Sequence, residues 1–254
     1  EDGIRDVERS RGLGDVYKRQ CGKSDNDVKG CKILSQLFGT TEGVGGVSVT
    51  DAKILAFPVR TLKGVFGWIT CPLVLDRYKR DLKMVGIQVN WGEVKLSSDD
   101  EAKVCKESNI ADKYVYIEDF QLRCGADEET SKIASEVARA LPNGNVYKSV
   151  REKLGKDLVI VSDDVFRDLV NLTTEVVTRI KIDPAKGTAA SRGLWSEEYI
   201  PTDTLLYSLV LVPSRLNGLK SEDVAKRLKN YDDKILQIGG DETVGKGFAR
   251  IKII

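Results

Sequence analysis

Residues 173–207 place the tightest constraint on the fold of this chain. Polar and β-branched residues alternate over 173–182, a polar stretch with proline and glycine covers 183–192, and apolar residues return over 194–200 toward a hydrophobic strand at 205–212. Alternation on both sides of a polar tip is typical of a β-hairpin. Because the tip has too few apolar side chains to pack in a core, we predict a long, protruding hairpin.

The other apolar patterns predict strands and helices in mixed order. A run at 54–59, a turn at 61–64 and a second run at 65–70 predict another hairpin. Pro72 suits the first turn of a helix, whose apolar face we assign to Leu73, Val74, Leu75, Tyr78 and Leu82. Elsewhere we predict helices at 28–38, 131–141, from 162 or 163, and at 221–228, with strands at 115–122, 158–161, 234–238 and 248–254. This mixture predicts an α+β fold.

The first twenty residues differ from the rest of the chain. Residues 1–20 are crowded with charge, show no helical or alternating apolar pattern, and do not begin with methionine. We interpret them as foreign to the fold or as a disordered arm. No internal repeat or linker divides the remainder, so residues 21–254 are predicted to form one domain.

Composition excludes several classes of protein. The chain has 254 residues with 40 basic and 39 acidic side chains, so any nucleic-acid surface must be local. It has no histidine, which excludes Ser-His-Asp and Cys-His hydrolases. The five cysteines include no C-x-x-C pair, which argues against a disulfide framework and a zinc site and fits the cytoplasm. No apolar run approaches the ~18 residues of a membrane span, so no membrane partner is expected.

The predicted hairpin carries a local excess of positive charge. Its cations are Arg179, Lys181, Lys186 and Arg192, against Asp183 alone, which gives four minus one, or +3. Such an excess suits a phosphate partner, and Trp195 and Tyr199 on the returning strand are suited to stacking on unpaired bases. The alternative is a solvated charged face with Trp195 packed against the sheet.

A glycine-rich loop follows the strand predicted at 234–238. Residues 240–246 fit G-x-x-x-x-G-K, but Gly247 stands where a magnesium-binding Ser or Thr is needed, and a strand follows where a P-loop requires a helix. A nucleotide-binding protein is therefore the less favoured alternative. The loop is either a tight turn or a site that binds the sugar-phosphate backbone of RNA; the residues of that site would be Gly239, Gly240, Gly245, Lys246 and Gly247.

Three pairs of adjacent carboxylates suggest metal or acid–base chemistry. They are Asp163-Asp164, Glu197-Glu198 and Asp241-Glu242. Adjacent residues of a strand point to opposite faces, so only one of Glu197 and Glu198 can face a given site. We interpret Asp163 as a helix cap and Asp241 as a turn residue, and we predict no metal site in this chain.

Three segments together resemble a known family. Residues 51–72 read DAKILAFPVRTLKGVFGWITCP, residues 174–183 and 194–201 read TEVVTRIKID and LWSEEYIP, and residues 237–247 read QIGGDETVGKG. In this order they are similar to blocks of the RAMP backbone subunit of type III-B CRISPR Cmr effector complexes. The resemblance runs from about Phe38 to the C-terminus.

The resemblance implies an RRM-like, ferredoxin-like βαββαβ palm with the hairpin as a protruding thumb. It implies that copies stack head to tail along a guide RNA, beside other Cmr subunits, and that each thumb interrupts the duplex of guide and target RNA. Target cleavage in the family depends on a divalent metal, Mg or Mn. The function implied is a guide-RNA-binding antiviral backbone subunit with endoribonuclease activity, and the alternative is a non-catalytic RNA-binding scaffold.

The resemblance also implies site residues. It adds Arg60 and Lys63 to the RNA-binding residues of the hairpin and the glycine-rich loop, and it gives Glu197 and Tyr199 supporting parts in cleavage. The family's first strand and its main catalytic aspartate precede the block at Phe38, and residues 1–20 do not match them. We therefore expect a palm with an exposed edge, weak RNA binding and no cleavage by this chain.

Overall fold

The computed structural model describes residues 37, 39–40, 43–213, 215–216 and 219–254. Residues 1–20 and most of the helix predicted at 28–38 lie outside this range. The chain divides into two compact units, which we describe separately. The sheet unit contains Ala52–Arg139 and Lys148–Tyr207, and the terminal unit contains Ala140–Tyr147, Ser208–Ile254 and the described residues up to Asp51.

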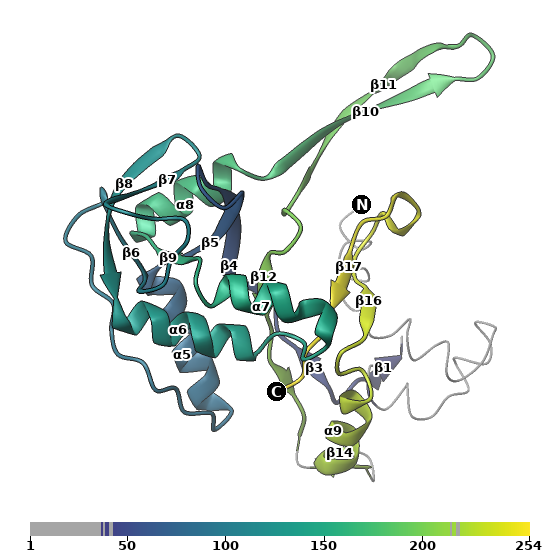
Figure 1. The fold of residues 1–254 in the computed structure, drawn as a ribbon. Coiled ribbons are helices and arrows are strands. Elements are labelled where there is room, and N and C mark those ends of the chain that lie inside the picture. The colour runs from purple at the N-terminus through teal and green to yellow at the C-terminus, as the bar shows by residue number, and fades with distance from the viewer. Residues whose placement is uncertain (1–36, 38, 41–42, 214, 217–218) are drawn as a thin grey trace. The chain divides into compact units, whose positions relative to one another are not determined.

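A seven-stranded mixed sheet forms the centre of the sheet unit (Figure 1). In spatial order its strands are β12 (Leu205–Tyr207), β4 (Lys53–Arg60), β5 (Phe66–Thr70), β9 (Leu158–Ile160), β6 (Glu101–Cys105), β8 (Phe120–Asp127) and β7 (Tyr114–Ile117). The pairs β5 with β9 and β6 with β8 are parallel, and the other neighbours are antiparallel. The predicted α+β class is confirmed at this level.

The core follows from the apolar runs of the central strands. Leu55–Val59 is a continuous buried stretch of β4, and Trp68 of β5 is fully buried. Strands that are covered on both faces read as such continuous runs rather than as alternating patterns. The predicted hairpin of β4 and β5 is confirmed, with register from Phe57 opposite Ile69 to Arg60 opposite Phe66.

Helix α5 (Pro72–Met84) begins with the predicted proline. Val74, Leu75, Tyr78 and Leu82 are buried as predicted, but Leu73 is 64% exposed and was wrongly placed on the apolar face. Its N-cap residue Cys71 makes no side-chain capping bond. The Asp163 carboxylate accepts the Leu73 amide instead, at 3.0 Å. Asp163 therefore caps a helix other than its own.

Three more helices belong to the sheet unit: α6 (Glu128–Arg139), α7 (Lys148–Leu154) and α8 (Asp163–Leu172). The start of α6 was predicted three residues late, because the Asp127 carboxylate accepts the Thr130 amide at 2.7 Å and caps an earlier turn. The start of α8 was predicted correctly, but its cap is Ser162, whose hydroxyl accepts the Val165 amide at 3.2 Å.

One predicted strand was wrong. The run at 115–122 is divided into β7 and β8 by a turn at Glu118 and Asp119, where Glu118 has a positive φ of 48°. Strand β6 and helix α7 were not predicted at all. Helix α7 was missed because it buries only Leu154 and therefore shows no apolar stripe in its sequence.

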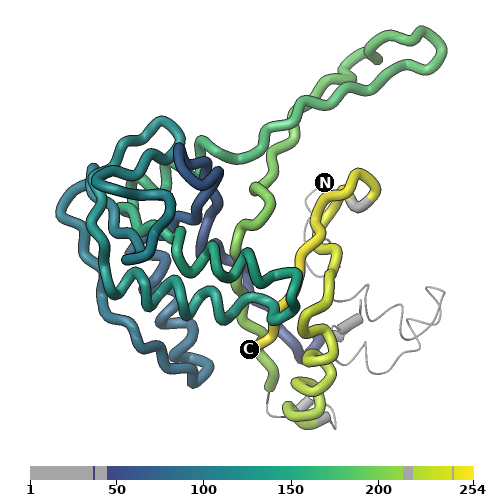
Figure 2. Tube along the Cα trace, in the orientation of Figure 1, coloured from purple at the N-terminus to yellow at the C-terminus, as the bar shows by residue number. Residues whose placement is uncertain are grey.

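The predicted hairpin at 173–207 is present as β10 (Glu175–Asp183) and β11 (Thr188–Tyr199), which form a two-stranded sheet with no third strand from the described residues (Figures 1 and 2). Its tip is shorter than predicted, since β11 begins at Thr188. The pairing shifts from Ile180 opposite Leu194 to Ile182 opposite Ala189, which leaves extra residues of β11 in a bulge. A Cβ on Gly193 would lie 2.9 Å from the Lys181 carbonyl oxygen, so this bulge requires glycine.

The described residues of the terminal unit form short strands and the helix α9. These are β1 (Gly39–Thr40), β2 (Gly43–Val44), β3 (Ser48–Val49), β13 (Val210–Leu211), β14 (Arg215–Leu216), β15 (Leu219–Lys220), α9 (Ser221–Lys229), β16 (Ile235–Gln237) and β17 (Phe248–Arg250), with 3₁₀ turns at Asn145–Tyr147 and Glu242–Val244. The strand predicted at 205–212 is divided between β12 and β13, and the one predicted at 248–254 ends at Arg250. Among the described residues, no helix has the length and apolar character needed to span a membrane.

Candidate nucleic-acid interface

The register of the β10–β11 hairpin brings four predicted site residues onto one face. Arg179 lies opposite Trp195, and Glu197 and Tyr199 follow at alternate positions of β11. Alternate residues of a strand share a face, so these side chains meet although β10 and β11 are separate stretches of sequence. We call Arg179, Trp195, Glu197 and Tyr199 the hairpin network.

Glu197 is the centre of the hairpin network. Its Oε2 accepts a hydrogen bond from Arg179 Nε at 2.6 Å and another from the Tyr199 hydroxyl. Its Oε1 accepts from Trp195 Nε1 at 2.8 Å, and Arg179 Nη2 donates to the Tyr199 oxygen at 3.3 Å. Trp195 keeps 45% of its surface exposed. The network is therefore ordered yet open to a ligand.

These contacts fix the charge of each group in the hairpin network. Hydrogen bonds from Tyr199, Trp195 and Arg179 lower the pKa of Glu197 to about 2. The hydrogen bond to Glu197 raises the pKa of Tyr199, and bonds to Tyr199 and Glu197 raise the pKa of Arg179. At neutral pH Glu197 is an anion with little affinity for a proton, so it is a poor general base and a good anchor for the guanidinium.

The other three predicted cations of the hairpin are exposed. Lys181, Lys186 and Arg192 form no ion pair with any residue that the structure describes. Arg192 has a positive φ of 55° within the bulge. Asp183 accepts the Ala185 amide at 2.9 Å and so orders the tip. Three of the four predicted cations are therefore unpaired among the described residues, whereas Arg179 is ion-paired with Glu197 and keeps its charge.

The opposite face of the hairpin differs in chemistry. Glu198 accepts a hydrogen bond from the Thr174 hydroxyl at 2.6 Å and takes no part in the hairpin network, as the alternation of strand residues predicts. Val176, Ile180 and Leu194 are exposed there. The hairpin thus has one face with the polar, aromatic network and one face that mixes exposed apolar side chains with polar ones.

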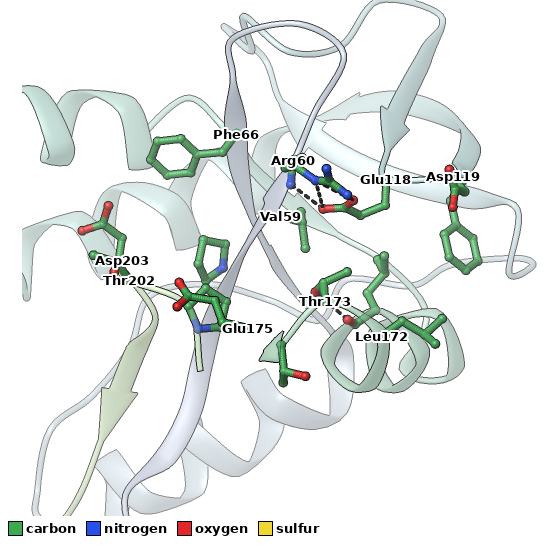
Figure 3. Close-up of a pocket in the computed structure, with 15 residues that line it drawn as sticks. Val59, Arg60, Phe66, Glu118, Asp119, Leu172, Thr173, Glu175, Thr202 and Asp203 are labelled. Atoms are coloured by element: carbon green, nitrogen blue, oxygen red, sulfur yellow. Dashed lines mark hydrogen bonds and ion pairs between the residues drawn. The ribbon is translucent and has the colours of Figure 1, made fainter. Parts of the chain in front are cut away.

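An open pocket of about 570 Å³ lies in the sheet unit where β4, the β7–β8 turn and the ends of β10 and β11 come together (Figure 3). Predicted residue Arg60 lines it and is paired with Glu118, which the sequence analysis missed. Predicted residue Lys63, in the adjoining β4–β5 turn, forms an ion pair with Asp112, which precedes β7. The only sequence signal for Glu118 is that two acidic residues interrupt the apolar run of 114–122.

The glycine-rich loop belongs to the terminal unit. Gly239, Gly245 and Gly247 all have positive φ, of 90°, 79° and 78°. A Cβ on Gly247 would lie 2.3 Å from the Ile238 carbonyl oxygen, so that position requires glycine for a close backbone approach. Gly240 has open space around it.

Hydrogen bonds within the loop and from Gln237 hold its backbone in place. The amides of Val244 and Lys246 both donate to the Asp241 carbonyl at 3.1 Å, and Gln237 Nε2 donates to the carbonyl oxygens of Gly239 and Gly240 at 3.1 Å. Strand β17 follows Lys246, where a P-loop would have a helix. The geometry is that of a tight turn in which some backbone amides already donate hydrogen bonds within the loop.

The remaining acidic and thiol groups have structural roles. Asp164 pairs with Arg167 at 2.7 Å. Burial raises the pKa of Cys71 and of Cys105 to about 12, so neither thiol is reactive. In the part of the chain that the structure describes, no three His, Cys, Asp or Glu side chains are grouped so as to hold a metal.

Comparison with known proteins gives concordant results. The model of the RAMP superfamily matches residues 10–250. The CRISPR system Cmr endoribonuclease Cmr4 of Pyrococcus furiosus is 43% identical over 227 residues, which are 87% of this chain and 75% of that protein. The CMR subunit Cmr4 of Saccharolobus solfataricus is 34% identical over 242 residues, 87% of this chain and 77% of that protein. The crystal structure of oligomeric Cmr4 from Pyrococcus furiosus superposes with a TM-score of 0.67 at 39% identity, over 86% of this chain and 76% of that one.

Proposed function

Because the chain belongs to the RAMP superfamily and, within it, to the Cmr4 family, we propose that it is a guide-RNA-binding backbone subunit of a type III-B CRISPR effector complex. The observation that carries this proposal is the β10–β11 hairpin. One face presents the hairpin network, and Lys181, Lys186 and Arg192 are exposed without ion-pair partners among the described residues. Exposed cations beside an aromatic side chain suit the phosphates and unpaired bases of RNA.

The finer architecture belongs to the same proposal. The seven-stranded sheet with its helices serves as the palm, and the β10–β11 hairpin serves as the thumb. Copies associate head to tail along the guide RNA, together with other Cmr subunits, and each thumb separates a stretch of the duplex of guide and target RNA. The oligomeric relative from Pyrococcus furiosus supports self-association.

In target cleavage we assign the hairpin network a supporting part. Glu197 holds Arg179 and Tyr199 in fixed positions, and Arg179 supplies positive charge toward a phosphate at which negative charge develops. A carboxylate whose pKa is about 2 is unsuited to removing a proton. Glu197 therefore positions other groups, and the rival function of a non-catalytic scaffold differs only in lacking the cleavage step.

A divalent metal, Mg or Mn, stays a proposal drawn from the family. The hairpin network is poorly suited to a metal ion, because both oxygens of Glu197 already accept hydrogen bonds and the described residues form no group of three metal-ligating side chains. The residues that the structure describes do not fit a metal site by themselves, so we derive no catalytic step through a metal.

The glycine-rich loop is proposed as a second, weaker RNA contact. Lys246 supplies charge, and Gly239, Gly240, Gly245 and Gly247 let the backbone approach a phosphate closely. Because a strand follows the loop, nucleotide binding is the less favoured function.

The decisive experiment measures RNA affinity and its dependence on salt. Fluorescence anisotropy with labelled single-stranded RNAs of unrelated sequence compares the chain with K181E/K186E. We expect weaker binding to all sequences and a shallower salt slope, by about 0.7 for each phosphate that the variant no longer neutralises. R80E/K83E is the matched control, since both residues are exposed on α5.

Two results would contradict the proposal. If the unchanged chain binds no RNA at low salt, RNA binding is wrong. If K181E/K186E binds as well as the unchanged chain, the hairpin is not part of the interface.

A further inference from the structure

Arg60 is held by Glu118 through both its side chain and its backbone. Arg60 Nε and Nη2 donate to Glu118 Oε2 at 2.9 and 2.5 Å, and the Arg60 amide donates to Oε1 at 2.9 Å. The Glu118 amide in turn donates to the Arg60 carbonyl oxygen at 3.0 Å. Figure 3 shows the two side chains directed toward each other, one from the end of β4 and the other from the β7–β8 turn.

The two partners of this pair are unequally exposed. The Glu118 side chain is 11% exposed, whereas that of Arg60 is 86% exposed. Burial acts to raise the pKa of Glu118, but hydrogen bonds from the Arg60 side chain and amide lower it overall. Glu118 also adopts a positive φ of 48°, which a non-glycine residue seldom does unless its surroundings fix it. The largely buried Glu118 carboxylate thus holds in place the exposed, flexible side chain of Arg60.

A guanidinium group has two edges that can each bind an oxyanion with two hydrogen bonds. Glu118 occupies the Nε and Nη2 edge of Arg60. Nη1 has no hydrogen-bond partner among the described residues, so the edge formed by Nη1 and Nη2 faces away from the carboxylate. A planar, exposed edge of this kind matches the geometry of a phosphate.

We propose that Glu118 is a positioning residue, which holds the Arg60 guanidinium with its outer edge ready for a phosphate of the bound RNA. The inference rests on the proposed RNA-binding function and deepens it by adding a residue of opposite charge to the interface. Holding the side chain in place before RNA arrives reduces the conformational entropy lost on binding.

Simple charge considerations lead to the opposite expectation. Glu118 is an anion close to a surface that binds a polyanion, so removing its charge would strengthen RNA binding if charge alone mattered. Only the Arg60 end of this ion pair is exposed, and screening by water at that end limits what the pair adds to folding stability, so stability alone explains the arrangement poorly. The sign of the change in affinity therefore decides between positioning and bulk electrostatics.

The experiment compares RNA affinity for E118Q, R60Q, the double variant and the control D119N. Asp119 is the exposed neighbouring carboxylate in the same turn and acts on Arg60 through charge alone, so D119N removes the same charge but none of the hydrogen bonds that hold Arg60. We expect R60Q to weaken binding about tenfold, E118Q about threefold, and the double variant no more than R60Q, because coupled residues are not additive. D119N should bind equally well or more tightly.

R60K tests the same idea in case E118Q does not fold. Its side chain keeps the charge but has no two-pronged edge, and Arg60 is too exposed for the change to unfold the chain. We expect R60K to weaken binding nearly as much as R60Q. Equal or tighter binding by E118Q or by R60K would overturn the role of Glu118 or of the guanidinium edge. Absence of RNA binding by the unchanged chain would instead reject the proposed function itself.

Discussion

Arg179 and Glu197 are 18 residues apart in the sequence and form an ion pair of 2.6 Å across the β10–β11 hairpin. The pair divides the cations of the hairpin into two kinds. Arg179 is held in a fixed position by a carboxylate, whereas Lys181, Lys186 and Arg192 have no such support among the described residues. The first kind suits the orientation of one phosphate, and the second suits general attraction of RNA.

The pKa of Glu197 predicts how the hairpin network responds to acid. Because this pKa lies near 2, below the ordinary value of 4.5, the network is fully formed above pH 4.5 and is lost as the pH falls through about 2. Carbon-13 NMR of the labelled Glu197 carboxyl group measures this directly. A midpoint near 4.5 would mean that the hydrogen bonds from Tyr199, Trp195 and Arg179 do not persist in solution.

In a subunit whose family N-terminal segment has been restored, assembled into a reconstituted complex, the substitution E197Q should reduce target-RNA cleavage about tenfold, with RNA affinity nearly unchanged. The reason is that Arg179 and Tyr199 lose the anion that positions them. The matched control is E198Q, which removes the neighbouring carboxylate from the opposite face. The rates are measured with magnesium and with manganese, and equal rates for the two variants would exclude Glu197 from catalysis.

The substitution G193A should distort the bulge of the hairpin, because an added Cβ would lie 2.8 Å from the Ala190 carbonyl oxygen. We expect faster hydrogen exchange of the hairpin amides and RNA binding weakened severalfold, with the thermal midpoint of the sheet unit little changed. G125A in β8 is the control, since a Cβ there meets only Lys103 Nζ, at 3.9 Å. Unchanged exchange in G193A would show that the bulge is not required.

The pair G245V and G245N tests the glycine-rich loop. Gly245 has a φ of 79° with open space around it, so backbone conformation alone limits the substitution. Asparagine tolerates this region, whereas valine is strained there by about 1–3 kcal/mol. We expect G245V to weaken guide-RNA binding more than G245N does. If both variants bind RNA as the unchanged chain does, the loop is only a turn.

The sequence predicted the parts of the fold in which local pattern and tertiary structure agree. The hairpin at 173–207 could be predicted because its two strands pair with each other and so keep the alternation of side chains that the sequence shows. The start of α5 could be predicted because Pro72 marks it. Strand β6 was missed, since only Ala102 and Val104 alternate in a polar stretch. All four residues of the hairpin network were named from the sequence, but the hydrogen bonds and ion pair that join them were not predicted.

Those partners depend on register and on turns. The Arg179–Glu197 pair follows from which residues of β10 and β11 lie opposite each other. Because the bulge of β11 shifts the register between Ile180 and Ile182, counting from the tip pairs the wrong residues. Glu118 was missed for a related reason. Its role depends on a turn that brings β7 and β8 back beside the end of β4, which no short-range pattern encodes.

The capping of α5 by Asp163 has a consequence for the order of folding. The carboxylate and the Leu73 amide are 90 residues apart, and the local residue Cys71 offers no substitute cap. During synthesis the first turn of α5 therefore emerges long before its cap does, and it frays until β9 has docked beside β5 and α8 has begun. In a nascent chain that ends before residue 163, the first turn of α5 would have no cap. Order in that turn should therefore appear late in folding, after the strands have taken their native arrangement.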